Sequence, residues 1–344
     1  MLCKESDLIL KTKGVSKIFT TAKNQSLIAC NDINLNIYKG KTLGIVGESG
    51  CGKSTFVRML MQLEEVSSGS IIYENRDIAH FSKKEIWEHR KNMQMIFQDS
   101  MASFNPKMKI IDIITEPLMN YGLLSNKDKK QKAEELLEMV ELSKEYLYSY
   151  PHNVSGGQLQ RIGIARALSL NPQILICDEA TSALDVSIQS SIIELLKKLQ
   201  KEKGLSIVFV CHDLALVQSF SHEVVVMYLG NIMEILPGQR VKKEALHPYT
   251  KALVNAVFTL DMNSKDNLEL LEGEVPSPLN IPKGCPFVNR CKSAIEICRI
   301  EKPVLEEIGI GHKIACHLIK EEVEKNKIKD NNKISGNIKL FTYK

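Results

Sequence analysis

The chain of 344 residues is 44% hydrophobic, which suffices for one large domain or for two of ordinary size. Its 45 basic and 41 acidic residues leave a formal charge of +4, and this near balance excludes the strongly basic surface of a dedicated nucleic-acid-binding protein. The first residues lack an apolar signal segment, and no run of 18 apolar residues appears along the chain. We therefore expect a protein that stays inside the cell, keeps its nine cysteines reduced and meets any membrane from the aqueous side.

A glycine-rich loop is the first strong signal. Short apolar runs separated by turn residues precede it, and residues 54–63 after it have helical spacing. The loop fits the pattern G-x-x-x-x-G-K-[ST], whose backbone N–H groups surround phosphate oxygens. Lys53 is expected to neutralise the β- and γ-phosphates, Ser54 to bind Mg²⁺, and Cys51 only to fill space. The expected phosphate loop consists of Gly47, Glu48, Ser49, Gly50, Cys51, Gly52, Lys53, Ser54 and Thr55.

A mostly helical, charged stretch follows from about Ser82 to Leu170, and we interpret it as a helical insertion. Within it, the sequence VSGGQ at residues 154–158 is a second glycine-bearing turn that opens a helix, so it too can bind an anion. The first loop already holds one nucleotide, and the second turn has a role most simply if it is presented to a nucleotide held by another chain. The residues expected to make that contact are Ser155, Gly156, Gly157 and Gln158.

Two apolar strands are predicted at residues 173–179 and 205–213, with an amphipathic helix at 186–204 between them. This order predicts a parallel sheet covered by helices. The first strand ends in Asp178 and Glu179, and two carboxylates at a buried strand end are costly unless a cation or a reacting proton needs them. Asp178 is expected to hold Mg²⁺ and Glu179 to be the general base for the attacking water. Without the phosphate loop, helix-capping acids would be the better interpretation of this pair.

The phosphate loop, the VSGGQ turn and the acidic strand end together resemble the ATP-binding cassette (ABC) family, in which two cassettes close head to tail over two ATP molecules. In that family VSGGQ is the signature motif. The resemblance implies that Gln98 reaches Mg²⁺ and the attacking water and links the nucleotide to a membrane partner, and that His212 binds the γ-phosphate. It also implies that Asp185, in the segment 182–185, contacts the opposite site, although this residue could equally cap the next helix.

Phe19 lies where the family has an aromatic side chain that stacks on adenine, but a core aromatic residue would give the same pattern. The fold class that the resemblance implies is α/β: a P-loop NTPase ABC cassette with a helical signature subdomain over about residues 98–170, followed by a small cysteine-bearing extension. The expected cassette domain covers residues 1–259.

Three further segments are similar to those of the ATP-binding subunits of dipeptide and oligopeptide importers: residues 103–106, 247–250 and 284–291. The likeness covers about residues 8–318, and the departures at Ala180 and Cys211 remove no reacting group. It implies an ATP-hydrolysing subunit on the cytoplasmic face of the cell membrane. The implied partners are a paralogous ATPase subunit, two membrane-spanning permease subunits and an extracytoplasmic peptide-binding protein, with no nucleic acid.

The polar and proline-rich composition after about residue 260 predicts a separate extension, residues 260–320, and a loosely ordered Lys/Asn-rich tail, residues 321–344. The extension contains Cys285, Cys291, Cys298 and Cys316, whose spacing is unlike that of a zinc ribbon or a bacterial ferredoxin. The resemblance implies a [4Fe-4S] cluster at these cysteines; a zinc ion and free buried thiols are the alternatives.

Three rival functions remain at this point. A nickel or metal-chelate importer would keep the cassette and change the cargo, although many such cassettes lack the cysteine-bearing extension. A soluble ABC ATPase that acts on ribosomes or DNA would often carry two cassettes or long insertions, and neither is seen in the sequence. A redox or iron sensor would be expected to lack Glu179 or His212, and both are present.

Overall fold

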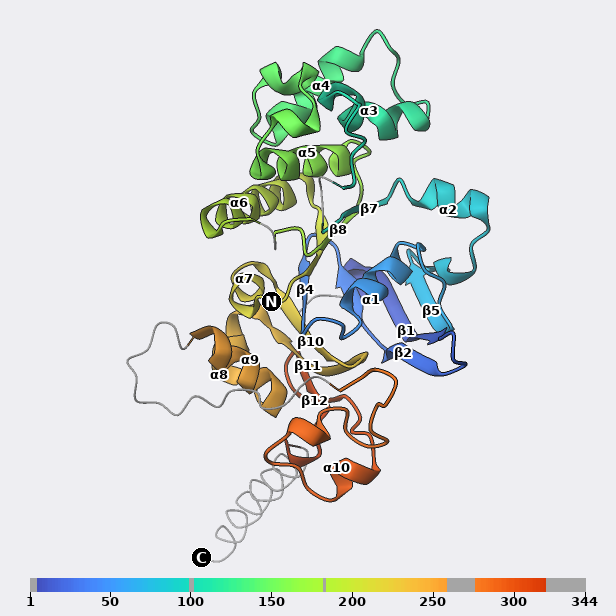
Figure 1. The fold of residues 1–344 in the computed structure, drawn as a ribbon, viewed down its shortest axis with the longest axis vertical. Helices are drawn as coiled ribbons and strands as arrows, with labels where there is room; N and C mark the ends of the chain where they lie inside the picture. Colours follow the sequence, from blue (N-terminus) through green and yellow to red (C-terminus); the bar gives the residue numbers. More distant parts are fainter. Residues whose placement is uncertain (1–4, 99–101, 182–183, 259–275, 320–344) are drawn as a thin grey trace, which may run out of the picture.

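The computed structural model describes residues 5–98, 102–181, 184–258 and 276–319. Its centre is an eight-stranded sheet, five neighbouring strands of which are parallel (Figure 1). Four of these strands are continuous apolar runs, as expected where helices cover both faces of a sheet. In spatial order the parallel strands are β10 (Glu223–Tyr228), β4 (Thr42–Val46), β9 (Ser206–Val210), β8 (Ile174–Asp178) and β7 (Met93–Ile96).

The predicted strand–helix–strand unit is confirmed, because β8 and β9 are parallel neighbours joined by the helix α6 (Val186–Lys203). The predicted strand–loop–helix unit is confirmed as β4, the phosphate loop and α1 (Lys53–Leu60). A further helix, α7 (Leu214–Phe220), follows β9 and packs on β4. Since β4, β8 and β9 are parallel, their carboxyl ends meet at one edge of the sheet, where ligands of open α/β sheets usually bind.

Three antiparallel strands extend the same sheet beyond β10: β11 (Asn231–Pro237), β13 (His312–Ile314) and β12 (Glu306–Gly309). The described part of the C-terminal segment therefore completes the central sheet and forms no separate sheet. Its remaining elements are short: the 3₁₀ turn η7 (Val288–Arg290) and the helix α10 (Ile297–Ile300). The predicted tail, residues 321–344, and most of the predicted boundary region near residue 260 lie outside the described residues.

A second, antiparallel sheet is built from the N-terminal half of the cassette and, with α1, shares a core with one face of the central sheet. The sequence analysis recognised only alternating apolar runs here. The strands are β2 (Ser26–Ile33), β1 (Leu8–Thr20), β5 (Ser68–Tyr73) and β6 (Arg76–Asp77), and β3 (Asn36–Tyr38) pairs with β1.

The stretch from Ser82 to Leu170 is mostly helical, as predicted, but it also contains strand β7. Its helices are α2 (Lys83–His89), α3 (Ile110–Asn120), α4 (Lys129–Met139) and α5 (Gly156–Leu168). Figure 1 shows α3, α4 and α5 gathered at one end of the molecule, away from α1. Two 3₁₀ turns, η3 (Lys144–Tyr148) and η4 (Pro151–Asn153), connect α4 to α5.

Two helices, α8 (Val241–Glu244) and α9 (Pro248–Phe258), follow β11. The short 3₁₀ turns η1 (Glu5–Asp7), η2 (Ile78–His80) and η5 (Gly238–Arg240) complete the described elements. None of the helices in the described ranges has the length and apolar character needed to span a bilayer. The apolar residues 224–236, the most membrane-like part of the sequence, form the β10–β11 hairpin of the central sheet.

Candidate nucleotide site

The phosphate loop joins β4 to α1 in a conformation that only glycine adopts at one key position. Gly52 has φ +104°, and a Cβ added there would lie 2.1 Å from the carbonyl oxygen of Ala29. The loop can therefore curl tightly against β2 and direct the first N–H groups of α1 toward its own centre. An anion cradle requires a loop of this shape, and the phosphate contacts themselves stay a prediction.

Lys53 is almost fully buried at the start of α1, with 4% of its surface exposed. Its ammonium group donates hydrogen bonds to the carbonyl oxygens of Gly47 (2.7 Å) and Glu48 (3.0 Å). A buried ammonium needs such partners, because an unpaired charge inside the protein is very costly. The lysine thus stands inside the loop, at the place where a phosphate oxygen can replace a carbonyl as its partner.

Ser54 and Asp178, two of the predicted Mg²⁺ ligands beside Gln98, are brought together from α1 and the end of β8. The hydroxyl of Ser54 donates a hydrogen bond to Oδ1 of Asp178 at 3.0 Å. Burial raises the pKa of Asp178, and the bond from Ser54 partly offsets this rise. Hydroxyl and carboxylate oxygens are ligands that Mg²⁺ prefers, and Mg²⁺ commonly takes only one or two from the protein and the rest from phosphates and water. The pair fits a Mg²⁺ ion that arrives with a nucleotide.

Glu179, the predicted general base, has a strained backbone. Its φ of +48° lies in the left-handed region, which costs a non-glycine residue on the order of 1–3 kcal/mol and is typical of functional positions. Its N–H donates to the carbonyl of Val210 on β9 (2.9 Å), which locks this turn. The amide Nε2 of Gln98 donates to Oε2 of Glu179 at 2.8 Å. The structure therefore brings the two residues, 81 positions apart, into direct contact.

The remaining predicted site residues are less tightly held. His212 is exposed just after β9, at the same sheet edge as Asp178 and Glu179. Phe19 is half-buried on β1, with the ammonium of Lys17 4.8 Å from its ring centre. Asp185 occupies the N-cap position of α6, but its side chain makes no capping hydrogen bond. Its neighbours in the predicted segment, residues 182–183, lie outside the described residues.

The VSGGQ turn, here called the signature turn (residues 154–158), is well formed but apart from the phosphate loop. Ser155 and Gln158 form a capping box at the start of α5: Ser155 Oγ accepts from the N–H of Gln158 (3.4 Å), and Gln158 Oε1 accepts from the N–H of Ser155 (2.8 Å). Ser155 and Gly156 are exposed, whereas Gly157 is buried against Ile188 of α6. Figure 1 places α5 with α3 and α4, so the chain does not close this turn over its own phosphate loop.

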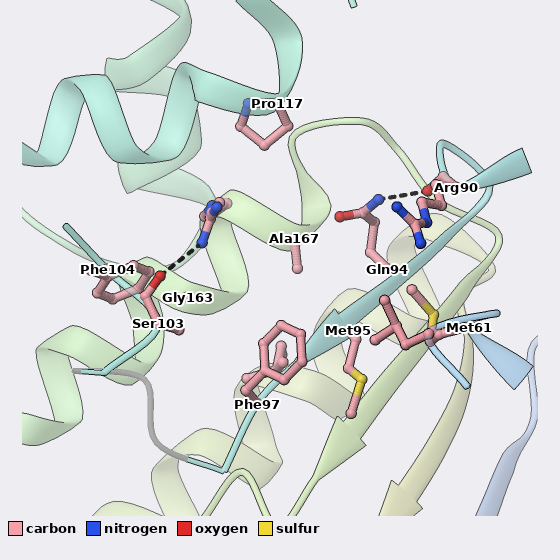
Figure 2. Close-up of a pocket in the computed structure, with 13 residues that line it drawn as sticks. Met61, Arg90, Gln94, Met95, Phe97, Ser103, Phe104, Pro117, Gly163 and Ala167 are labelled. Atoms are coloured by element: carbon pink, nitrogen blue, oxygen red, sulfur yellow. Dashed lines mark hydrogen bonds between the residues drawn. The ribbon is translucent and has the colours of Figure 1, made fainter. Parts of the chain in front are cut away.

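A pocket of about 210 Å³ lies between the central sheet and the helical end of the molecule. Figure 2 shows Met95 and Phe97 on one side of it, with Pro117 of α3 and Ala167 of α5 across from them. Phe97 directly precedes Gln98, and 42% of its surface is exposed. The sequence analysis missed this pocket, because nothing in the local pattern distinguishes an exposed phenylalanine from a buried one.

The four cysteines of the C-terminal segment form no metal site in the described structure, where no three or more His, Cys, Asp or Glu side chains are arranged to hold a metal ion. Burial raises the pKa of Cys285 to about 12 and also raises the pKa of Cys291 and Cys316. The structure gives the predicted cluster no support.

Two family models match the chain. Residues 30–182 match the model described as ABC transporter, and residues 233–298 match the C-terminal region of the oligopeptide/dipeptide transporter. Among solved structures, the dimeric post-hydrolysis state of the ATP-binding cassette MJ0796 bound to ADP and Pi is 30% identical, with a TM-score of 0.61; the match covers 67% of this chain and 98% of that one. The structure of cbiO1 from Clostridium perfringens is 27% identical, with a TM-score of 0.63, over 74% of this chain and 96% of that one.

Curated relatives extend the likeness over most of the chain. The oligopeptide transport ATP-binding protein OppF of Haemophilus influenzae is 49% identical over 309 residues, 89% of this chain and 93% of the relative. OppF of Escherichia coli is 45% identical over 295 residues, 85% of this chain and 88% of the relative. AppF of Bacillus subtilis is 42% identical over 327 residues, 92% of this chain and 99% of the relative. The chain therefore belongs to the ABC transporter ATPase family, in the branch that carries the oligopeptide/dipeptide transporter C-terminal region.

Proposed function

We propose that this chain binds and hydrolyses ATP on the cytoplasmic face of the cell membrane to drive the import of peptides. The observation that carries the proposal is the meeting of two residue pairs beside the phosphate loop: Ser54 with Asp178, and Gln98 with Glu179. One pair has the oxygens for Mg²⁺, and the other has a carboxylate held in place to accept a proton. Such an arrangement suits the transfer of a phosphoryl group to water.

The residues then divide the chemistry of hydrolysis. The phosphate loop and Lys53 bind the phosphates, and Phe19 stacks on the adenine. Ser54 and Asp178 would hold a Mg²⁺ ion, which would neutralise charge that develops on the phosphates. Glu179 accepts a proton from the attacking water. At the same time the water oxygen forms a bond to the γ-phosphorus, and the bond between the γ-phosphorus and the leaving oxygen of ADP breaks. His212 hydrogen-bonds the γ-phosphate as this happens.

A second cassette completes the site in this proposal. The signature turn exposes Ser155 and Gly156 and lies apart from the phosphate loop of its own chain, so the N–H groups outside its capping box can be presented to a nucleotide held by another chain. Asp185, at the start of α6, contacts the nucleotide site of the partner cassette. The partner is a paralogous ATPase subunit, and an extracytoplasmic peptide-binding protein delivers the cargo.

We infer that a short segment of a membrane-spanning permease subunit occupies the pocket beside Phe97. The pocket wall combines exposed apolar side chains, Phe97 and Leu63 at 42% and 45% exposure, with Arg90. The Nε of Arg90 is buried and has no hydrogen-bond partner among the described residues, so an apolar segment with one acidic side chain fits the pocket. Movement of that segment would displace Phe97 and the adjacent Gln98, and so reach Glu179.

The permease contact has a matched pair of variants. Phe97→Asp places a carboxylate in the apolar wall and should abolish co-purification of the permease subunits, while ATP binding persists. Leu123→Asp alters a more exposed apolar residue, at 59% exposure, that does not line the pocket, and should leave co-purification intact. Equal loss in both variants would count against the pocket as the contact.

Peptides are favoured over nickel or metal chelates as the cargo. The relatives described above are named for oligopeptide transport, and the match to the oligopeptide/dipeptide C-terminal region includes three of the four extension cysteines. No observation favours a ribosomal or DNA partner. A [4Fe-4S] cluster at the four cysteines stays a prediction of the family resemblance alone; anaerobic purification followed by iron and sulfide analysis would test it.

The deciding experiment is a pull-down of the tagged chain from gently solubilised membranes, with ATP hydrolysis measured beside a Glu179→Gln variant. We expect a second cassette and two permease proteins to co-purify. The variant should lose at least about 100-fold in turnover and still bind ATP, because only the proton acceptor is removed. A ribosome or DNA as the captured partner would refute the importer and leave only the ATPase.

A further inference from the structure

Glu48, the second residue of the phosphate loop, is held from three directions. Its N–H donates to the hydroxyl oxygen of Tyr249 on α9 at 2.9 Å. Its carbonyl oxygen accepts the bond from Lys53. Its carboxylate forms two hydrogen bonds with the guanidinium of Arg290, at 2.6 and 3.1 Å. Two of the three partners come from outside the nucleotide-binding motifs, and Arg290 lies 242 positions further along the chain.

Arg290 is itself fixed in place. It ends η7, and its side chain is only 6% exposed. Nη1 also lies 3.4 Å from the hydroxyl of Tyr228, on β10. Phe287, at the other side of η7, packs edge-on against Tyr228 and at 5.3 Å from the ring of Tyr249. The segments 247–250 and 284–291 therefore meet behind the phosphate loop and place a fixed cation on Glu48.

A carboxylate in a phosphate-binding loop works against the loop's ligand, because like charges in a partly buried site repel strongly. The side chain of Glu48 is 23% exposed, so water screens its charge only in part. The guanidinium of Arg290 neutralises the carboxylate of Glu48 and fixes its orientation through two hydrogen bonds. Bidentate pairs of this kind are the strong form of the arginine–carboxylate interaction. Removing Arg290 alone would leave an unpaired negative charge beside the phosphates, and removing both charges would not.

We propose that Arg290 is a positioning residue for ATP binding, through which the C-terminal segment neutralises Glu48 and holds the phosphate loop in its nucleotide-binding form. The inference rests on the proposed function of ATP binding. It gives the C-terminal segment a role in the ATPase site itself, independent of any metal at its cysteines.

A double-mutant cycle at Arg290 and Glu48, made in the full chain, tests this role. Equilibrium MgATP binding is measured for the wild type, Arg290→Gln, Glu48→Gln and the double variant. Arg290→Gln should weaken binding about tenfold, and the double variant should recover most of that loss, because the unpaired carboxylate is gone. The MgATP affinity of Arg290→Lys should lie between those of the wild type and Arg290→Gln, since an ammonium keeps the positive charge but cannot form the bidentate hydrogen bonds of a guanidinium. Arg299→Gln removes the same charge from exposed α10 in the same segment and should bind ATP as the wild type does.

Thermal unfolding of each variant separates positioning from folding. Should Arg290→Gln fail to fold, Arg290→Lys and the double variant carry the comparison. The proposal is overturned if folded Arg290→Gln binds MgATP as the wild type does, or if the double variant is no better than Arg290→Gln. Failure of the wild type itself to bind MgATP would instead refute the proposed function.

Discussion

The phosphate loop before α1 and the signature turn before α5 are both glycine turns at a helix N-terminus, but their surroundings differ. The phosphate loop is enclosed by its own chain: Lys53 is buried, Ser54 bonds Asp178, and Glu48 is held by Tyr249 and Arg290. The signature turn is held by its own capping box and by the hydrogen bond that Gln158 donates to the hydroxyl of Tyr146 on η3, and Ser155 and Gly156 are exposed.

This difference shows how one chain can contribute the phosphate loop to its own nucleotide site and the signature turn to the site of a partner chain. Buried, multiply bonded groups are already positioned for a ligand, so little ordering is needed on binding. An exposed turn with a complete capping box is equally ordered, but it lies apart from the phosphate loop of its own chain. The first region should therefore control ATP binding by a single chain, and the second should control only what two chains do together.

The largest expected effect comes from Gly52→Ala. The added Cβ would meet the carbonyl oxygen of Ala29 at 2.1 Å, at a φ of +104° that alanine avoids. We expect MgATP affinity to fall by at least about 100-fold, because the loop must open to relieve the clash. Equilibrium binding by the isolated chain measures it; unchanged affinity would show that the loop is not the nucleotide site.

Gly156→Asp tests the other turn. A carboxylate on this exposed residue would repel the phosphates of a partner's nucleotide without entering the chain's own phosphate loop. We expect ATP hydrolysis by the assembled transporter to fall about tenfold or more, with MgATP affinity of the single chain within about twofold of wild type. Gly156→Ala is the matched control, since its Cβ would lie 3.6 Å from Leu184, an ordinary contact. Equal loss of single-chain binding in Gly156→Asp would contradict the division between the regions.

The pH dependence of folding stability tests the role of His247, which holds Tyr249 behind the phosphate loop. His247 is buried, and burial lowers its pKa from 6.5 to about 4; its Nδ1 accepts the N–H of Tyr249. Because the unfolded chain takes up the proton first, stability present above pH 6.5 is lost as the pH falls toward 4, by up to about 3 kcal/mol. Denaturant unfolding of wild type and His247→Gln at several pH values measures this, and the variant should show a shallower acid loss. Parallel pH curves would rule His247 out as the cause.

The smallest expected effect is that of Cys51→Ala. Burial raises the pKa of this thiol, so it stays protonated and unreactive although it lies inside the loop. Its backbone is what faces a phosphate, and we expect MgATP affinity to change by less than about threefold. Equilibrium MgATP binding to the variant measures this effect. As a second readout, the Cys51 thiol of the wild type should resist alkylation. A tenfold loss would mean that the sulfur contributes directly to the site.

Much of the site could be predicted from local patterns. The phosphate loop, the acidic end of β8 and the strand–helix–strand unit are each encoded within about 40 consecutive residues or fewer, where spacing and glycine placement set the backbone. The parallel part of the sheet followed from the same patterns. The antiparallel N-terminal sheet did not, since β1 pairs irregularly with both of its neighbours and β5 lies far from β1 in the sequence.

The amino-acid sequence by itself determined which groups are available for chemistry: Lys53, Ser54, Asp178, Glu179 and His212, each at the end or start of a predicted element. Only the tertiary structure decided which of them meet. The contact of Gln98 with Glu179 and the pairing of Arg290 with Glu48 span 81 and 242 positions. Such contacts depend on how the sheet and the C-terminal segment pack together, and no local periodicity records that. The same holds for the backbone of Glu179, whose left-handed conformation is imposed by its bond to β9 and not by its own preference.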